Sequence, residues 1–85
     1  MFLINYVGED LDFMGAYRVC LNTIVRMGEE MDSEKLRILP KGSRVNVTHR
    51  KGRRVRIDSP VIGWCSVIAR NGDTILTKIV VNSYH

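Results

Sequence analysis

The stretch that decides the fold is residues 39–66, which read LPKGSRVNVTHRKGRRVRIDSPVIGWCS. Apolar and polar residues alternate in two runs, 44–49 and 54–58, which flank a basic turn at 50–53 containing a glycine. Because successive strand side chains point to opposite faces, this pattern predicts an antiparallel hairpin. One face should carry Val45, Val47, Val55 and Ile57, and the other Arg44, Asn46, Thr48, Arg50, Arg54 and Arg56. We interpret the hairpin as the centre of a small, strongly bent β-barrel.

Short β segments are predicted on both sides of this hairpin. Before it, residues 15–21 should form a strand with Tyr17, Val19 and Leu21 on one face, followed by strands at 23–27 and 36–39. After it, strands are predicted at 61–69 and 74–81, and Asn71-Gly72 between them favours a tight hairpin turn. Residues 2–7 are a candidate first strand. Many short strands with turn residues between them indicate an all-β domain.

The acidic segment 28–35 opens with Gly28 and is predicted to be a loop. A short helical turn capped by Asp32 or Ser33 is the alternative, because propensity is only a weak guide. The sequence therefore predicts an N-terminal extension at 1–14, for which an added strand is one interpretation, and a barrel at 15–85.

Composition restricts the class of protein. The chain has 85 residues, of which 45% are hydrophobic and 26% charged, as expected for one soluble globular domain. No apolar run approaches the ~20 residues that cross a bilayer, and no secretory leader is evident. Cys20 and Cys65 lack metal-ligand spacing, so reduced core thiols, a cytoplasmic location and no metal or cofactor are expected. A disulfide is the alternative for the cysteines.

Charge is divided unevenly along the chain. Residues 1–34 carry two basic and seven acidic side chains, net −5, whereas residues 35–85 carry eleven basic and two acidic, net +9. Such asymmetry indicates a surface for a charged partner, unless the acidic segment lies across the basic one. The predicted basic face comprises Arg44, Arg50, Lys51, Arg53, Arg54 and Arg56.

The order of several motifs resembles the bacterial-type Src-homology-3 (SH3b-like) family. These motifs are the strand ending in Arg26, the Leu39-Pro40-Lys41-Gly42 turn, the Val45-Asn46-Val47 strand, the Val55-Arg56-Ile57 strand and Gly63-Trp64-Cys65. The similarity covers roughly residues 17–69. The similarity implies a partly open β-barrel of about five strands that binds rather than catalyses. The motifs near the C-terminus are also similar to SH3-like modules within larger proteins of microbial eukaryotes.

This resemblance implies a non-catalytic protein-interaction module. Trp64 and Tyr17 are the expected groove residues for a peptide, and Glu29, Glu30 and Asp32 of the acidic loop should select its charge pattern together with the basic hairpin. The chain lacks the paired tryptophans that grip proline-rich peptides in eukaryotic relatives, so a charged segment is the expected ligand. Each feature has a structural alternative. Trp64 would be a partly buried ring that seals one end of the core, and the basic face would be a solvated hairpin whose arginine stems cover apolar surface.

The same residues raise two other hypotheses of function. A nucleic-acid-binding barrel using the basic face is the second hypothesis. An enzyme built on His49, Asp58 and Cys65 is not expected, because alternation places His49 on the side of Val45 and Val47 near the hairpin tip, away from Cys65. No membrane contact is expected, and an exposed terminal strand offers pairing with a second copy.

Overall fold

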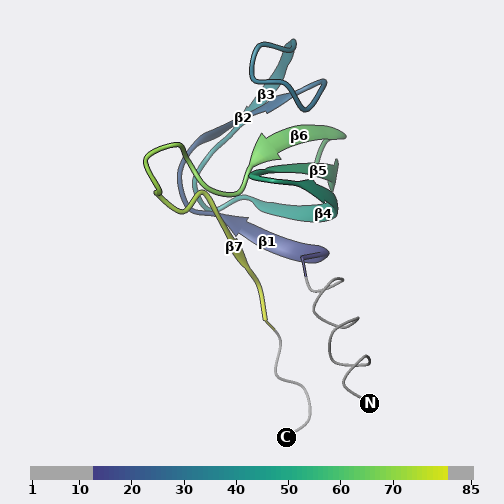
Figure 1. Ribbon diagram of the computed structural model, residues 1–85. Helices are drawn as coiled ribbons and strands as arrows, with labels where there is room; N and C mark the ends of the chain where they lie inside the picture. The colour runs from purple at the N-terminus through teal and green to yellow at the C-terminus, as the bar shows by residue number, and fades with distance from the viewer. Residues whose placement is uncertain (1–12, 81–85) are drawn as a thin grey trace, which may run out of the picture.

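The computed structural model describes residues 13–80, which form seven strands (Figure 1). The strands are β1 (Gly15–Val19), β2 (Thr23–Arg26), β3 (Lys35–Leu39), β4 (Arg44–Lys51), β5 (Arg54–Ser59), β6 (Gly63–Ser66) and β7 (Leu76–Lys78). The predicted first strand at 2–7 and Val81, with most of the N-terminal extension, lie outside the described residues. The prediction of an all-β domain is confirmed for the described part.

All seven strands belong to one antiparallel sheet with the order β3-β2-β6-β5-β4-β1-β7. The sheet bends strongly but does not close, since β3 and β7 are its two edges (Figure 1). The strand count is therefore higher than the expected five or so. The β2–β3 hairpin, with the loop that joins these two strands, extends beyond the stacked strands β6, β5, β4 and β1 (Figure 1).

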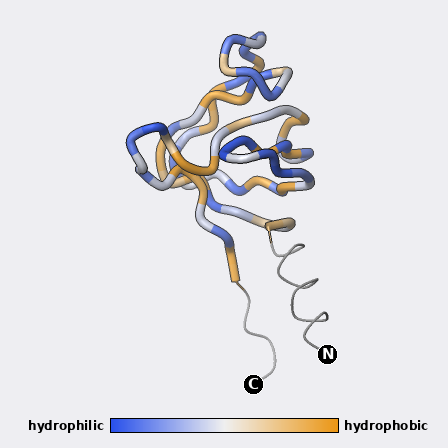
Figure 2. The backbone as a smooth tube through the Cα atoms, in the orientation of Figure 1, coloured by the Kyte–Doolittle hydropathy of each residue, from blue (hydrophilic) through white to orange (hydrophobic). Residues whose placement is uncertain are grey.

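The central hairpin forms as predicted, with β4 antiparallel to β5 and a turn around Gly52. Val45, Val47, Val55 and Ile57 are each at most 1% exposed and lie in one apolar cluster. The cluster also contains Tyr17, Val19, Val25, Leu39, Cys65, Val67 and Leu76. Figure 2 shows hydrophilic residues gathered at the β4–β5 turn and in the loops, away from this core.

The prediction that side chains alternate strictly between the two faces of β4 is wrong beyond Val47. The β4–β5 register pairs Val47 with Ile57 but His49 with Arg56, so Thr48 is an extra residue in the ladder. Such a bulge reverses the faces of the residues that follow, because directly opposed residues share a face. His49 therefore lies on the face of Arg56, and Arg50, opposite Val55, does not.

Two other predictions near strand ends are also corrected. Leu21 lies beyond the end of β1 and is 43% exposed, unlike Tyr17 and Val19. The strand predicted at 61–69 is only β6, Gly63–Ser66. Loop 28–34 contains no helix, so its prediction as a loop is confirmed.

The Asn71-Gly72 turn forms, but it does not join two long paired strands. The Ala69 amide donates to the Asp73 carbonyl, and the Gly72 amide donates to the Ala69 carbonyl. One isolated bridge joins Ile68 to Thr74. The chain then crosses to β1, with which β7 pairs from Leu76 to Lys78. A turn motif specifies only its local geometry, whereas the partner of the returning strand depends on which sheet edge can bury Leu76.

Candidate functional site

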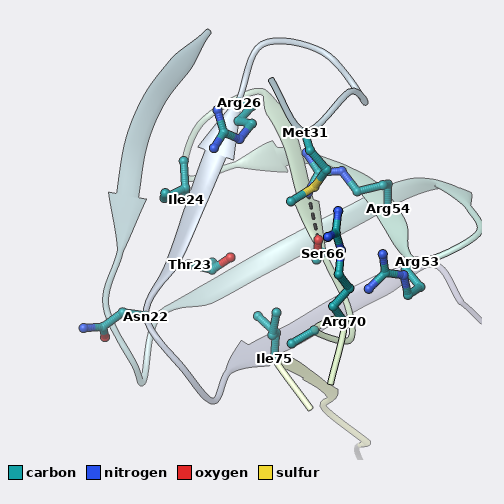
Figure 3. Close-up of a pocket in the computed structure, with 11 residues that line it drawn as sticks. Asn22, Thr23, Ile24, Arg26, Met31, Arg53, Arg54, Ser66, Arg70 and Ile75 are labelled. Atoms are coloured by element: carbon teal, nitrogen blue, oxygen red, sulfur yellow. Dashed lines mark hydrogen bonds between the residues drawn. The ribbon is translucent and has the colours of Figure 1, made fainter. Parts of the chain in front are cut away.

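An arginine-lined pocket of about 250 Å³ lies between β2, the start of β5, the end of β6 and the turn at 69–73. We call it the arginine pocket. Its lining residues are Asn22, Thr23, Ile24, Arg26, Met31, Arg53, Arg54, Ser66, Ala69, Arg70 and Ile75. In Figure 3, Arg26 and Arg54 lie on one side of Ser66, and Arg53 and Arg70 on the other. None of these lining residues carries a carboxylate, so all the formal charge is positive.

Arg54 forms the wall of the pocket at β5. It is directly opposite Ser66 on β6, and its Nη1 donates to Ser66 Oγ at 2.8 Å (Figure 3). Its Nε donates to the backbone carbonyl of Glu29 at 2.8 Å. Its Nη2 is buried and has no hydrogen-bond partner within residues 13–80. A buried cationic donor without a partner is costly, so this atom would gain from an anionic ligand.

The acidic loop, residues 28–34, is held beside the pocket. Arg26 Nη1 donates to the carbonyl of Ser33 at 2.8 Å, and Lys51 Nζ lies 2.8 Å from Glu29 Oε2. Ser33 Oγ also donates to the carbonyl of Glu30 at 2.7 Å. The suggestion that the acidic segment lies across the basic one is therefore correct for Glu29 and Lys51, and the carboxylate raises the pKa of Lys51 through a hydrogen bond and its charge.

The positive charge of the arginine pocket is not neutralised by any residue of its lining. Burial, together with the positive charges of Arg26 and Arg53, lowers the pKa of Arg54, while Cys65 acts in the opposite direction. Burial raises the pKa of the Cys65 thiol to about 11, against the influence of Arg54. Since Cys65 is thus neutral at physiological pH, it does not neutralise Arg54.

Trp64 lies on β6, two residues before Ser66 of the pocket lining. Its cross-strand neighbours are Arg26 on β2 and Arg56 on β5, so an arginine flanks it on each side. The side chain is half-buried and is not a member of the apolar cluster. Trp64 and Ser66 share the outer face of β6 because they are two residues apart.

Tyr17 is not placed with Trp64. It is 7% exposed within the apolar cluster on β1, and its hydroxyl donates to the carbonyl of Phe13 at 2.7 Å. β5 and β4 separate β1 from β6 in the sheet. The two aromatic residues expected to form one groove therefore lie on different strands and in different surroundings.

The predicted basic face is divided in the same way. Arg53 and Arg54 enter the arginine pocket, and Arg56 lies beside Trp64. Arg50 Nε folds back onto the carbonyl of Gly52 at 2.8 Å, and Lys51 pairs with Glu29. Arg44 lies at the far end of β4, opposite Arg18. Of the acidic residues, Glu29 contacts the hairpin, whereas Glu30 and Asp32 are exposed in the loop.

The residues weighed for catalysis are not brought together. Cys65 is fully buried on the core side of β6, and His49 is exposed opposite Arg56 on the outer side. Asp58 accepts a hydrogen bond from Asn46 Nδ2 at 2.9 Å. The two cysteines are not joined; Cys20 is half-buried rather than a core residue, with its Sγ 3.0 Å from Thr77 Oγ1.

Residues 13–80 contain no cluster of three or more His, Cys, Asp or Glu side chains suited to a metal ion. A helix with the length and apolarity to cross a membrane is also lacking in this part of the chain.

No family model matches the chain, and neither the curated proteins nor the solved structures include a significant match to it. The SH3b-like resemblance therefore rests on the sequence motifs alone.

Sequence reasoning missed half of the pocket arginines. Arg26 and Arg70 were not predicted as site residues, and neither was Ser66. No local pattern indicates them as a group, because β2, β6 and the 69–73 turn meet only in the folded sheet. The one signal was Arg26 at the end of its strand, a position that the family motif includes.

Proposed function

We propose that the protein is a non-catalytic interaction module that binds an acidic segment of a protein partner across the outer face of β2, β6 and β5. The observation that carries this proposal is the placement of Trp64 between Arg26 and Arg56. Aromatic residues and arginine are the side chains most enriched at binding hot spots. The Trp64 ring offers an apolar anchor for the partner, and the guanidinium groups of Arg26 and Arg56 can bind carboxylates on both sides of it.

An SH3-like barrel is the fold we propose for this module. The strongly bent antiparallel sheet and the central β4–β5 hairpin support it, together with the motif order of the sequence. Small β-barrels commonly serve as binding scaffolds, although a fold alone does not define a function. A cytoplasmic setting fits two unjoined cysteines.

Non-catalytic binding is favoured by the state of Cys65. A thiol nucleophile acts as the thiolate and must be reachable. Cys65 is fully buried with a pKa of about 11, and His49 lies on the other side of the sheet. The binding residues we propose are Trp64, Arg26, Arg54 and Arg56, with the acidic loop setting charge selectivity. Tyr17 is assigned to the core.

A nucleic-acid partner is the second candidate, and the arginine pocket is the observation that favours it. Salt dependence separates the two. Binding to duplex DNA should weaken with salt with a log–log slope of about −0.9 per phosphate neutralised. Absence of binding to short RNA and DNA oligonucleotides at low salt would eliminate this candidate.

The test of the proposal uses a short fluorescein-labelled peptide in which glutamates flank a leucine. Fluorescence polarisation should show binding to the wild type, and a loss of about tenfold or more for Trp64→Ala and for Arg56→Gln. Arg37→Gln on edge strand β3, which also removes an exposed arginine, is the matched control and should bind normally. Equal binding by Trp64→Ala in a folded state would refute the role of this face.

A further inference from the structure

We infer that the arginine pocket holds a phosphate group carried on a serine or threonine of the partner, so that the module reads a phosphorylated segment. This inference rests on the proposed function and deepens it by naming the ligand. It is carried by the pocket and its four arginines, of which the proposed function uses only Arg26 and Arg54.

The first observation is the concentration of guanidinium groups. Four arginines line one pocket of about 250 Å³, and none of the lining residues is acidic. Arg53 and Arg70 are exposed, and their side chains make no hydrogen bond or ion pair within the described chain. Arginine forms bidentate bonds to phosphate, and clusters of arginines recognise phosphorylated motifs.

The second observation is the unused bonding capacity at the back of the pocket. Arg54 is fixed by Glu29 and Ser66 through Nε and Nη1, while Nη2 is buried without a partner in residues 13–80. Ser66 Oγ accepts from Arg54, so its own proton remains to be donated. Met31, 50% exposed, also lines the pocket beside Arg54 (Figure 3), and its flexible side chain can yield to a ligand.

The chemistry of the pocket favours phosphate over carboxylate. A phosphorylated side chain carries about −1.5 to −2 charges and three strong acceptor oxygens. A carboxylate has one charge and two oxygens, enough for one bidentate arginine. Only the phosphate matches several guanidinium groups that approach from β2, β5 and the 69–73 turn.

The surroundings of the pocket favour a protein over a nucleic acid. Glu29, Glu30, Asp32 and Glu34 belong to the loop that is hydrogen-bonded to Arg26 and Arg54 at the pocket. A single phosphate brings its charge only into the pocket, where the one lining residue from this loop is the uncharged Met31. A nucleic-acid backbone, with a charge at every nucleotide, would be repelled where it left the pocket.

The position of Trp64 adds a sequence preference. Trp64 and Ser66 are two residues apart on one face of β6, which corresponds to about 7 Å along a strand. An extended peptide with its phosphate beside Ser66 places a side chain two residues away over Trp64. We therefore expect an apolar residue two positions from the phosphorylated residue.

The experiment compares three biotinylated peptide libraries with one central residue, phosphoserine, serine or glutamate, and random flanks. Wild-type protein should retain the phosphoserine library about tenfold or more tightly than the other two, with apolar residues selected two positions away. Arg53→Gln combined with Arg70→Gln should remove this difference. Arg44→Gln combined with Arg37→Gln, which removes the same charge outside the pocket, should retain it.

Each remaining outcome overturns the inference. Equal retention of the glutamate and phosphoserine libraries would overturn it while leaving the proposed function intact. Retention of no library at all would overturn both. Equal loss of the phosphoserine preference in the two double variants would show that the preference depends only on the overall charge of the protein. A short oligouridine that binds through Arg53 and Arg70 and displaces the phosphoserine library would assign the pocket to nucleic acid.

Discussion

The Nε atom of Arg54 donates a 2.8 Å hydrogen bond to the carbonyl of Glu29, a residue 25 positions earlier in the chain. This bond joins the loop between β2 and β3 to the central hairpin. The same guanidinium group donates a hydrogen bond to Ser66 Oγ at the pocket. The shapes of the loop and of the pocket therefore depend on one side chain.

Arg54→Met is expected to release the acidic loop. It removes the hydrogen bonds to the Glu29 carbonyl and to Ser66 Oγ but also removes the cost of burying a charge. The free energy of unfolding should therefore change little, while the loop becomes more accessible. A glutamate-specific protease should cut the variant faster after Glu29 and Glu30. Arg53→Met is the control, because Arg53 is exposed and its variant should be cut like the wild type.

Gly63→Ala should destabilise the β2–β6 contact. A Cβ at Gly63 would lie 2.5 Å from Val25 Cγ1 and 2.8 Å from the carbonyl oxygen of Arg26, so the backbone must move. Overpacking of this kind costs on the order of 1–3 kcal/mol, measurable by urea denaturation. Gly52→Asn is the control: nothing lies within 4 Å of its Cβ position, and asparagine tolerates the positive φ there. Equal stability of Gly63→Ala and the wild type would contradict the close approach.

Ile57 and Ile38 should respond very differently to truncation. Ile57 is fully buried in the apolar cluster, whereas Ile38 on edge strand β3 is 63% exposed. Ile57→Ala should lower the free energy of unfolding by about 2–5 kcal/mol, and Ile57→Val by about 0.5–1.5 kcal/mol. Ile38→Ala should change it by less than about 0.5 kcal/mol. Similar losses at both positions in chemical denaturation would mean that β3 is covered in solution.

Cys65 should make stability fall at alkaline pH. Burial raises its pKa from 9.0 to about 11, so the folded state binds the thiol proton more tightly than the unfolded state. Its contribution is therefore complete below pH 9.0 and is lost as pH rises towards 11. A shift of this size corresponds to roughly 3 kcal/mol.

The measurement is urea denaturation across this pH range for the wild type and Cys65→Ala. Subtracting the two curves cancels the lysine and tyrosine titrations that both proteins share. The difference should shrink as pH rises. A difference that stays constant would show that the thiol does not titrate with a raised pKa.

Much of the architecture was predictable because it depends on local pattern. Alternating valines and isoleucines on both sides of Gly52 sufficed for the central hairpin and four buried residues. Loop 28–34 followed from its glycine and charges in the same way. The bulge at Thr48 was not predicted, although polar His49 stands where the alternation requires an apolar residue. The bulge moved His49 and Arg50 to the opposite faces.

The site was only partly predictable. Arg53, Arg54, Arg56 and Trp64 were selected because a hairpin and a short motif contain them, and they lie in or beside the arginine pocket. Arg44 and Arg50 were grouped with them by proximity in sequence, but they lie elsewhere. Tyr17 matched the aromatic character of a groove residue and was found in the core.

By itself, the amino-acid order determined the central hairpin of β4 and β5 and its apolar face of Val45, Val47, Val55 and Ile57, because a period of two is a property of a few consecutive residues. Only the tertiary structure decided that β6 lies between β2 and β5, which brings Arg26, Arg70 and Ser66 to Arg54. Strand order depends on contacts between residues far apart in the chain. The arginine pocket is a product of that order.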